Sequence, residues 1–159
     1  MTPHTASWHE SPVVDARVES ILSQMTLDDK IALVSGQLGV LDDGSVPAMP
    51  AGLPPLGLAD GPAGVRVANP ELSGHRTTAL PAPIALAATW STELAARYGH
   101  VIGAEGAAIG RNIFLGPAVD IARSPWGGRT FESFGEDPLL QSRLVASEIQ
   151  AIQSHPVVA

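Results

Sequence analysis

Apolar residues recur with helical spacing in the N-terminal part of the chain. The first predicted helix covers residues 13–25, and its apolar face consists of Val14, Val18, Ile21, Leu22 and Met25. Thr26 opens a Thr-Leu-Asp-Asp segment that resembles a capping box, in which the hydroxyl accepts a hydrogen bond from the amide three residues on. A second short helix is therefore predicted, ending at Gly36.

Two further helices are predicted in the C-terminal half, each with its own start signal. Ser91 is a candidate N-cap, and the apolar pattern that follows runs to a stop at Gly110. Asp137 is a candidate N-cap with proline at the first helical position, and His155-Pro156 ends that helix.

Short apolar runs lie before, between and after these two helices. Residues 56–59 predict a buried strand that delivers Asp60 at its C-terminal end, residues 112–115 predict a second strand, and residues 157–159 resemble the start of a third. Loops are predicted over 36–55, 61–89 and 116–135. Strands that alternate with helices predict an α/β fold with a parallel sheet. Three short strands make a poor independent core, so the chain is expected to be part of a larger domain.

Composition narrows the class of protein. Of 159 residues 45% are hydrophobic and 16% charged, which is typical of a folded chain. A net charge of −7 argues against nucleic-acid or anionic-membrane partners. No cysteine is present, which excludes disulfides and thiolate metal sites, and no metal or cofactor is expected. No signal peptide or membrane span is recognisable, so a cytoplasmic location is expected.

Asp60 is the first residue with candidate chemistry. A carboxylate at the C-terminal end of a parallel strand faces the edge where α/β proteins build their sites, and it can accept hydrogen bonds from two sugar hydroxyls. The alternative is that Asp60 only stabilises the Asp-Gly-Pro turn that it begins.

A second constellation occupies the loop over 116–135 and its C-terminal flank. Its charged members are Arg123, Arg129, Glu132, Glu136 and Asp137, and its aromatic members are Trp126, Phe131 and Phe134. Arginine donors suit vicinal hydroxyls or carboxylates, and aromatic faces stack on sugar rings. The alternative is an internal Arg129–Glu132 ion pair that pins the loop, and both interpretations can hold together.

Other catalytic signatures are missing from the sequence. The five histidines include no pair at metal-ligand spacing, and no Gly-x-Ser-x-Gly, Gly-x-Gly-x-x-Gly or phosphate-loop motif occurs. The two glycines of Gly103-Ala-Glu-Gly106 are interpreted as a packing feature of their helix.

Several motifs in a fixed order resemble the N-terminus of the family 3 glycoside hydrolases, the β-glucosidase family. The resemblance covers residues 17–159. The motifs are Thr26-Leu-Asp-Asp-Lys-Ile31, Leu58-Ala-Asp-Gly-Pro-Ala-Gly-Val65, Leu80-Pro-Ala-Pro-Ile-Ala-Leu-Ala-Ala-Thr-Trp90, Arg123-Ser-Pro-Trp-Gly-Gly-Arg-Thr-Phe-Glu132 and Glu136-Asp-Pro138.

The resemblance implies a (β/α)8 TIM-like barrel, of which this chain would supply about two βα units and the start of a third strand. It also implies retaining hydrolysis of terminal non-reducing β-D-glucosyl residues. Asp60 and Arg129 match residues that bind the terminal sugar, and Glu132 matches the carboxylate that supports the arginine. The family's nucleophile, its acid/base and a sugar-binding Lys-His pair are expected beyond Ala159, so the 159-residue chain alone is predicted to be inactive.

The expected organisation is a flexible arm over residues 1–12 and a partial barrel domain over 13–159. The expected partner is a β-glucoside or related carbohydrate, and the oligomeric state is left open. Two alternatives remain at this point: a truncated, non-catalytic product that binds sugars or oligomerises, or a small α/β domain that binds an anion through Arg123 and Arg129.

Overall fold

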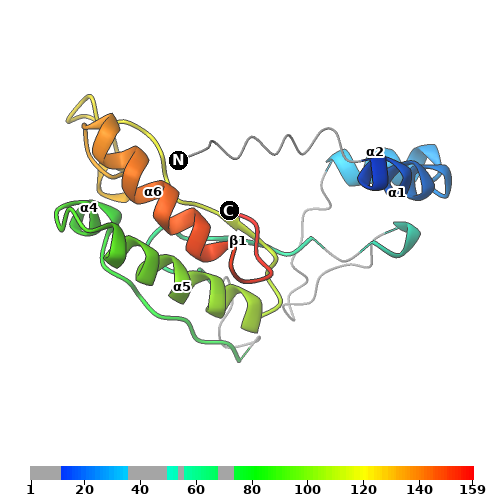
Figure 1. Cartoon of the computed structure of the whole chain (residues 1–159), viewed down its shortest axis with the longest axis horizontal. Coiled ribbons are helices and arrows are strands. Elements are labelled where there is room, and N and C mark those ends of the chain that lie inside the picture. The colour runs from blue at the N-terminus through cyan, green and yellow to red at the C-terminus, as the bar shows by residue number, and fades with distance from the viewer. Residues whose placement is uncertain (1–11, 36–49, 54–55, 68–73) are drawn as a thin grey trace. The chain divides into compact units, whose positions relative to one another are not determined.

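The computed structural model describes residues 12–35, 50–53, 56–67 and 74–159 (Figure 1). These residues belong to two compact units. The described part of the first unit contains helices α1 (Pro12–Ser23) and α2 (Leu27–Ser35) and the 3-10 turn η1 (Pro50–Gly52). The second unit contains every later element. The expected arm lies almost entirely outside the described residues, as does most of the predicted loop over 36–55.

The first unit confirms the two predicted N-terminal helices. The Thr26 hydroxyl accepts a hydrogen bond from the Asp29 amide (3.1 Å), and the Asp29 carboxylate accepts one from the Thr26 amide (2.9 Å). This reciprocal pair is the predicted capping box. The Thr26 hydroxyl also donates to the same Asp29 oxygen (2.7 Å), and this bond, followed by the one from the Thr26 amide, lowers the pKa of Asp29 below its usual value because both favour the ionised carboxylate. Met25, which precedes the cap, is 7% exposed.

The second unit is built on a small parallel sheet, as predicted. Strand β1 (Leu58–Asp60) pairs with β2 (Ile113–Leu115), and Ala59 lies opposite Phe114. The Ile113 amide donates to Gly57, whereas the Phe114 amide donates to Val158 (2.7 Å). Successive amides of a strand point to opposite sides, so β2 lies between β1 and the segment at Val158. Val158 forms a parallel bridge with Ile113, which confirms the expected start of a third strand.

Helices α5 (Thr92–Ala108) and α6 (Pro138–Ile152) lie side by side next to this sheet (Figure 1). Both begin at their predicted caps: Ser91 Oγ accepts from the Leu94 amide (3.1 Å), and Asp137 Oδ1 accepts from the Leu139 amide (2.8 Å). The core between the helices and the sheet contains Ala59, Ala95, Ile102, Phe114, Phe134, Leu144, Ile152 and Val157.

The sequence interpretation needs three corrections in this unit. The first strand begins at Leu58 rather than at residue 56, and only Ala59 within it is buried, because the other face of the sheet carries no covering element in the described residues. The loop predicted over 61–89 contains helix α4 (Pro83–Ala87), which is too short to show a period. The loop predicted over 116–135 contains the 3-10 turn η2 (Thr130–Glu132).

Candidate functional site

Asp60 lies at the carboxyl end of β1, opposite Leu115 at the carboxyl end of β2. Because the two strands are parallel, the segments that follow them leave the same edge of the sheet. One segment is the turn after Asp60, and the other is the long connection that leads to Arg129 and Glu132. The topology therefore directs both sequence-predicted groups toward one edge.

The turn after Asp60 is tight and needs glycine. Gly61 has φ +118°, and a Cβ there would lie 2.1 Å from the Gly64 carbonyl oxygen. The Asp60 carbonyl accepts from the Arg66 amide (2.7 Å), and its carboxylate Oδ1 accepts from the Gly61 amide (2.8 Å). The turn-stabilising interpretation of Asp60 is thus confirmed for one carboxylate oxygen. The other oxygen, Oδ2, lies 3.8 Å from Arg66 Nη1.

Arg129 and Glu132 form the predicted ion pair. The single turn of η2 brings the two side chains together, and Arg129 Nε donates a hydrogen bond to Glu132 Oε2. The Arg129 side chain is 72% exposed, whereas that of Glu132 is only 18% exposed. The half-buried Glu132 therefore fixes the position of the Arg129 side chain. Most N–H donors of the guanidinium still face solvent, so the arginine is pre-organised to bind a ligand.

The charge of Asp60 acts on the Arg129–Glu132 pair. The pKa of Arg129 is raised above its usual value, first by the hydrogen bond and charge of Glu132 and then by the charges of Asp60 and Asp120. Carboxylates from both segments thus act on one guanidinium. The Asp60 carboxylate and the Arg129–Glu132 ion pair lie on segments that leave the same carboxyl edge of the sheet, and together they are called the charged cluster below.

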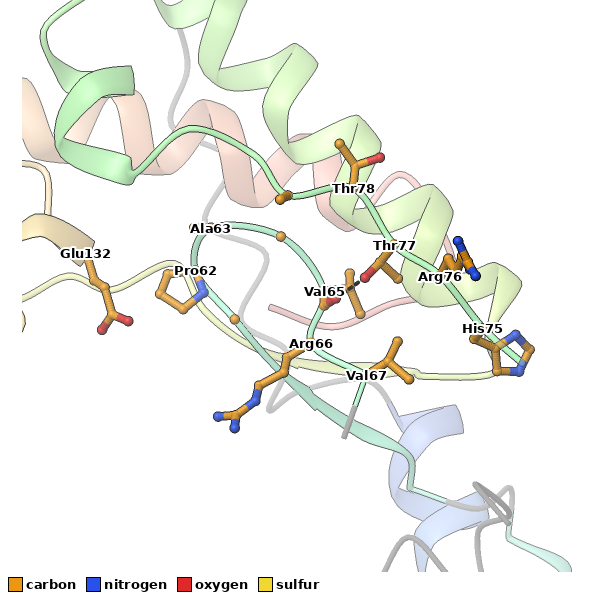
Figure 2. A pocket seen from close by; sticks show the side chains of 13 residues that line it. Pro62, Ala63, Val65, Arg66, Val67, His75, Arg76, Thr77, Thr78 and Glu132 are labelled. Carbon is orange, nitrogen blue, oxygen red and sulfur yellow. Dashed lines mark hydrogen bonds between the residues drawn. The ribbon is translucent and has the colours of Figure 1, made fainter. Parts of the chain in front are cut away.

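Two hollows adjoin this cluster. The larger, of about 530 Å³, lies between the turn over 61–67 and the segment over 75–79, and Glu132 reaches it from the opposite side (Figure 2). In the same view the Arg66 side chain extends away from the segment over 75–79. The smaller hollow, of about 290 Å³, is lined by Asp120, Arg123 and Arg129. The larger volume falls within the range of about 300–1,000 Å³ that ligand pockets occupy.

The remaining candidates of the long connection separate into different roles. Trp126 is 92% exposed, and Phe131 is also exposed. Phe134 is a core residue, so its expected place in an aromatic ligand surface is wrong. Glu136 is exposed, and Asp137 caps α6 with its carboxylate.

Sequence reasoning missed Arg66 and Asp120 as members of this cluster. Arg66 lies six residues after Asp60, and only the fold of the glycine-containing turn reveals that the two side chains meet. Asp120 follows the end of β2, just as Asp60 ends β1, and that shared position was the available signal.

Within the ranges that the structure covers, no group of three or more His, Cys, Asp or Glu side chains is arranged to hold a metal ion. None of the helices in these same ranges is long and apolar enough to cross a membrane.

A family model described as the glycosyl hydrolase family 3 N-terminal domain matches residues 61–159. The chain belongs to glycosyl hydrolase family 3. Among its relatives in this family, a beta-glucosidase of Bacteroides ovatus is 38% identical over 153 residues, which cover 92% of this chain and 20% of that protein. Beta-glucosidase B of Emericella nidulans is 39% identical over 144 residues, which cover 91% of this chain and 17% of that protein.

Solved structures of family 3 enzymes share this fold. Beta-glucosidase 3B from Thermotoga neapolitana in complex with glucose superposes with a TM-score of 0.76 and 37% identity, over 89% of this chain and 22% of that one. A beta-glucosidase from Streptomyces venezuelae in complex with D-glucose superposes with a TM-score of 0.71 and 40% identity, over 87% of this chain and 17% of that one. The chain thus spans about a fifth of the length of the curated relatives it matches.

Proposed function

We propose that this chain is the N-terminal portion of an exo-acting retaining β-glycosidase, and specifically of a β-glucosidase that hydrolyses terminal non-reducing β-D-glucosyl residues. Membership of glycosyl hydrolase family 3 supports the hydrolase class. The beta-glucosidase names of the relatives and the glucose bound in two of the solved structures support the choice of sugar.

The role proposed for this segment is part of the sugar-binding subsite, supplied by Asp60, Arg129 and Glu132. The observation that carries this proposal is the single charged cluster that they form at the carboxyl edge of the sheet. The Asp60 carboxylate accepts hydrogen bonds from sugar hydroxyls, and the exposed donors of Arg129 give hydrogen bonds to hydroxyl oxygens. Glu132 holds the arginine in place and is a positioning residue.

The catalytic carboxyl groups are proposed to lie elsewhere in the polypeptide. A retaining mechanism needs a nucleophile and an acid/base about 5–5.5 Å apart. Glu132 is committed to Arg129, and Asp60 to the Gly61 amide, so neither is a good candidate for proton transfer or attack. Residues 1–159 alone are therefore expected to be inactive.

The fold proposed for the whole domain is a (β/α)8 barrel, of which β1, α5, β2, α6 and the segment at Val158 form the first part. Parallel strands alternate with helices that cover one face of the sheet. The other face exposes Leu58 and Leu115. In a closed barrel such inward-pointing apolar side chains pack against those of the remaining strands.

The direct test is hydrolysis of aryl glycosides by the polypeptide that carries these residues. The substrates are the β-glucoside, β-xyloside and N-acetyl-β-glucosaminide, and proton NMR identifies the anomer released first. We expect the β-glucoside to be preferred and its β configuration to be retained. Asp60→Ala should lower kcat/KM by about a hundredfold, because groups that bind the substrate's hydroxyls lose their hydrogen bonds in the transition state.

Glu136→Ala is the matched control, since it removes an exposed carboxylate from the segment between η2 and α6. It should leave kcat/KM unchanged. Full activity of the Asp60→Ala enzyme would overturn the proposed role of Asp60. Release of the α anomer would overturn the retaining mechanism.

A further inference from the structure

Two histidines that are 55 residues apart in the sequence meet on the helical side of the second unit. His100 lies on α5, and His155 follows the end of α6. The distance between His100 Nδ1 and His155 Nε2 is 3.4 Å, and the rings are nearly perpendicular, at 82°. The Ser154 hydroxyl lies 3.3 Å from the same His100 nitrogen. Two potential metal ligands, His155 Nε2 and Ser154 Oγ, therefore lie within 3.4 Å of a third, His100 Nδ1.

The contact is built into the helix packing. A Cβ added to Gly103 would lie 2.6 Å from His155 Cδ2, so the missing side chain makes room for the imidazole. Gly103 is three residues after His100 and therefore lies on the same face of α5. The backbone of His155 is held on both sides, because its amide donates to Ile152 (3.0 Å) and its carbonyl accepts from Val157 (2.7 Å).

The protons of this cluster leave ligand lone pairs available. The Ser154 hydroxyl donates its only proton to the Ala151 carbonyl (2.7 Å), so toward His100 it can only accept. In the neutral cluster, the Nδ1 proton of His100 thus serves both Ser154 Oγ and His155 Nε2. When this proton moves to Nε2 of the same ring, which gives the other neutral tautomer, a metal ion at His100 Nδ1 meets two imidazole nitrogens and a hydroxyl oxygen.

The spacing fits a tetrahedral ion. Zinc–imidazole bonds are about 2.0–2.1 Å long, so two nitrogens at tetrahedral angles around zinc are about 3.3–3.4 Å apart. The observed separation is 3.4 Å. The C-terminal end of α6, beside Ser154 and His155, is the negative end of its helix dipole, and the chain's net charge of −7 also favours a cation.

We propose that His100 and His155 form a binding site for a divalent first-row transition metal ion such as Zn²⁺, with the Ser154 hydroxyl and water completing its coordination. Imidazole suits such ions, and His100 is exposed, so solvent can reach the fourth position. The bound ion links α5 to the segment that leads from α6 to Val158. The site lies on helical residues distinct from Asp60, Arg129 and Glu132, and it does not depend on the proposed sugar subsite.

The test is titration of the full chain with Zn²⁺ by calorimetry after treatment with chelator. His4→Gln and His9→Gln are introduced first, so that the histidines of the N-terminal segment do not contribute. We expect one ion per chain. His100→Ala should weaken binding at least roughly 10–100-fold, the loss that removal of even an outer-shell partner causes. His75→Gln, at an exposed histidine in the segment between β1 and α4, should leave binding unchanged.

A second readout identifies the ligands directly. Electron paramagnetic resonance of the Cu²⁺-loaded chain should show hyperfine coupling to two imidazole nitrogens, and to one in the His100→Gln chain. His155 packs against Gly103, so a substitution of His155 can disturb the packing of α5 and α6. The variants of the exposed His100 therefore provide the test of metal binding. Equal Zn²⁺ affinity in the parent chain and the His100→Ala chain, or coupling to a single nitrogen in the parent, would overturn the proposal.

Discussion

Two glutamates, 16 residues apart in the sequence, have contrasting environments. Glu148 belongs to the helical layer, formed by α5 and α6, and Glu132 belongs to the carboxyl edge of the sheet. Glu148 on α6 is 1% exposed, and neither of its carboxylate oxygens has a hydrogen-bond partner. Burial raises its pKa to about 8. Glu132 lies in η2 and is bound to the guanidinium of Arg129. One carboxyl is buried without compensation, and the other is paired and aimed at a hollow.

The comparison separates the part of the chain that carries stability from the part proposed to carry function. On α5, Tyr98 shares its one hydroxyl proton between the carbonyl oxygens of Pro62 and Pro81, and burial together with the charge of Glu148 raises its pKa. These contacts hold α5 against the turn that follows Asp60 and against the segment that precedes α4. At the sheet edge the charges are paired, Asp60 with Arg66 and Glu132 with Arg129, and both arginines are largely exposed. Substitutions in the layer should therefore change the free energy of unfolding, and substitutions at the edge should change activity.

The largest effect on stability is expected from Gly99→Ala. A Cβ at Gly99 would lie 2.3 Å from the Glu148 carbonyl oxygen, so α5 and α6 would have to separate. We expect a loss of about 2–4 kcal/mol, since overpacking against backbone has no flexible side chain to absorb it. Gly106→Ala is the control on the same helix, because its Cβ would meet nothing closer than 3.5 Å. It should be neutral or stabilising by up to about 1 kcal/mol. Equal urea midpoints for the two variants would contradict the close approach of the helices.

Glu148→Gln should make stability less dependent on pH. The folded pKa of about 8 lies above the ordinary glutamate pKa of 4.5, which applies in the unfolded chain, so the stability linked to this carboxyl is full below pH 4.5 and is lost as pH rises through 8. The variant should match the parent near pH 4 and be more stable by a few kcal/mol, on the order of 2–4, near pH 9. Urea unfolding across this range measures the difference, with Glu136→Gln as an exposed control. A difference that stays constant with pH would show that Glu148 does not titrate in this way.

Asp137→Ala should lower the free energy of unfolding by about 1 kcal/mol, because two amides at the start of α6 lose their hydrogen-bond acceptor. Asp137→Ser restores a capping oxygen and should recover most of the loss. The thermal midpoints of the two variants make the comparison. If alanine and serine were equally destabilising, the cap would not be the reason.

The smallest effect on stability is expected from Glu132→Gln. Its partner Arg129 is largely exposed, so solvent and salt screen the pair, and the free energy of unfolding should not change measurably. The guanidinium should nevertheless lose its fixed position, which the NMR signal of the Arg129 Nε–H group reports through faster exchange. In the polypeptide that carries these residues, kcat/KM for the aryl β-glucoside should fall. An unchanged signal would mean that Glu132 does not hold the arginine.

Local signals predicted the elements of the fold well. Ser91 and Asp137 begin their helices because each offers a side-chain acceptor to amides of the first turn. Such contacts join residues two or three positions apart, so the sequence pattern reveals them. The parallel order followed from the alternation of strands and helices. Helix α4 was not predicted, because five residues are too few to show a helical period. Phe134 was predicted to be a surface residue, but its burial depends on packing against α6 and the sheet rather than on its neighbours in the chain.

The candidate site was predicted in its parts but not in its arrangement. Arg129–Glu132 is a contact across three residues, so its spacing was visible in the sequence. The approach of Arg66 to Asp60 depends on the path of a glycine-rich turn, and the meeting of His100 with His155 depends on how closely α5 and α6 pack. Such contacts between distant residues follow from tertiary structure and leave no local pattern.

A double-mutant cycle of Asp60→Ala and Arg129→Ala tests most directly whether the two segments at the sheet edge bind one sugar ring. The measured quantity is kcat/KM for an aryl β-glucoside, in the polypeptide that carries these residues. If both side chains bind the same ring, each single variant should lose activity, and the double variant should lose clearly less than the product of the two single losses. Independent, multiplicative losses, or full activity in either single variant, would contradict a shared sugar site.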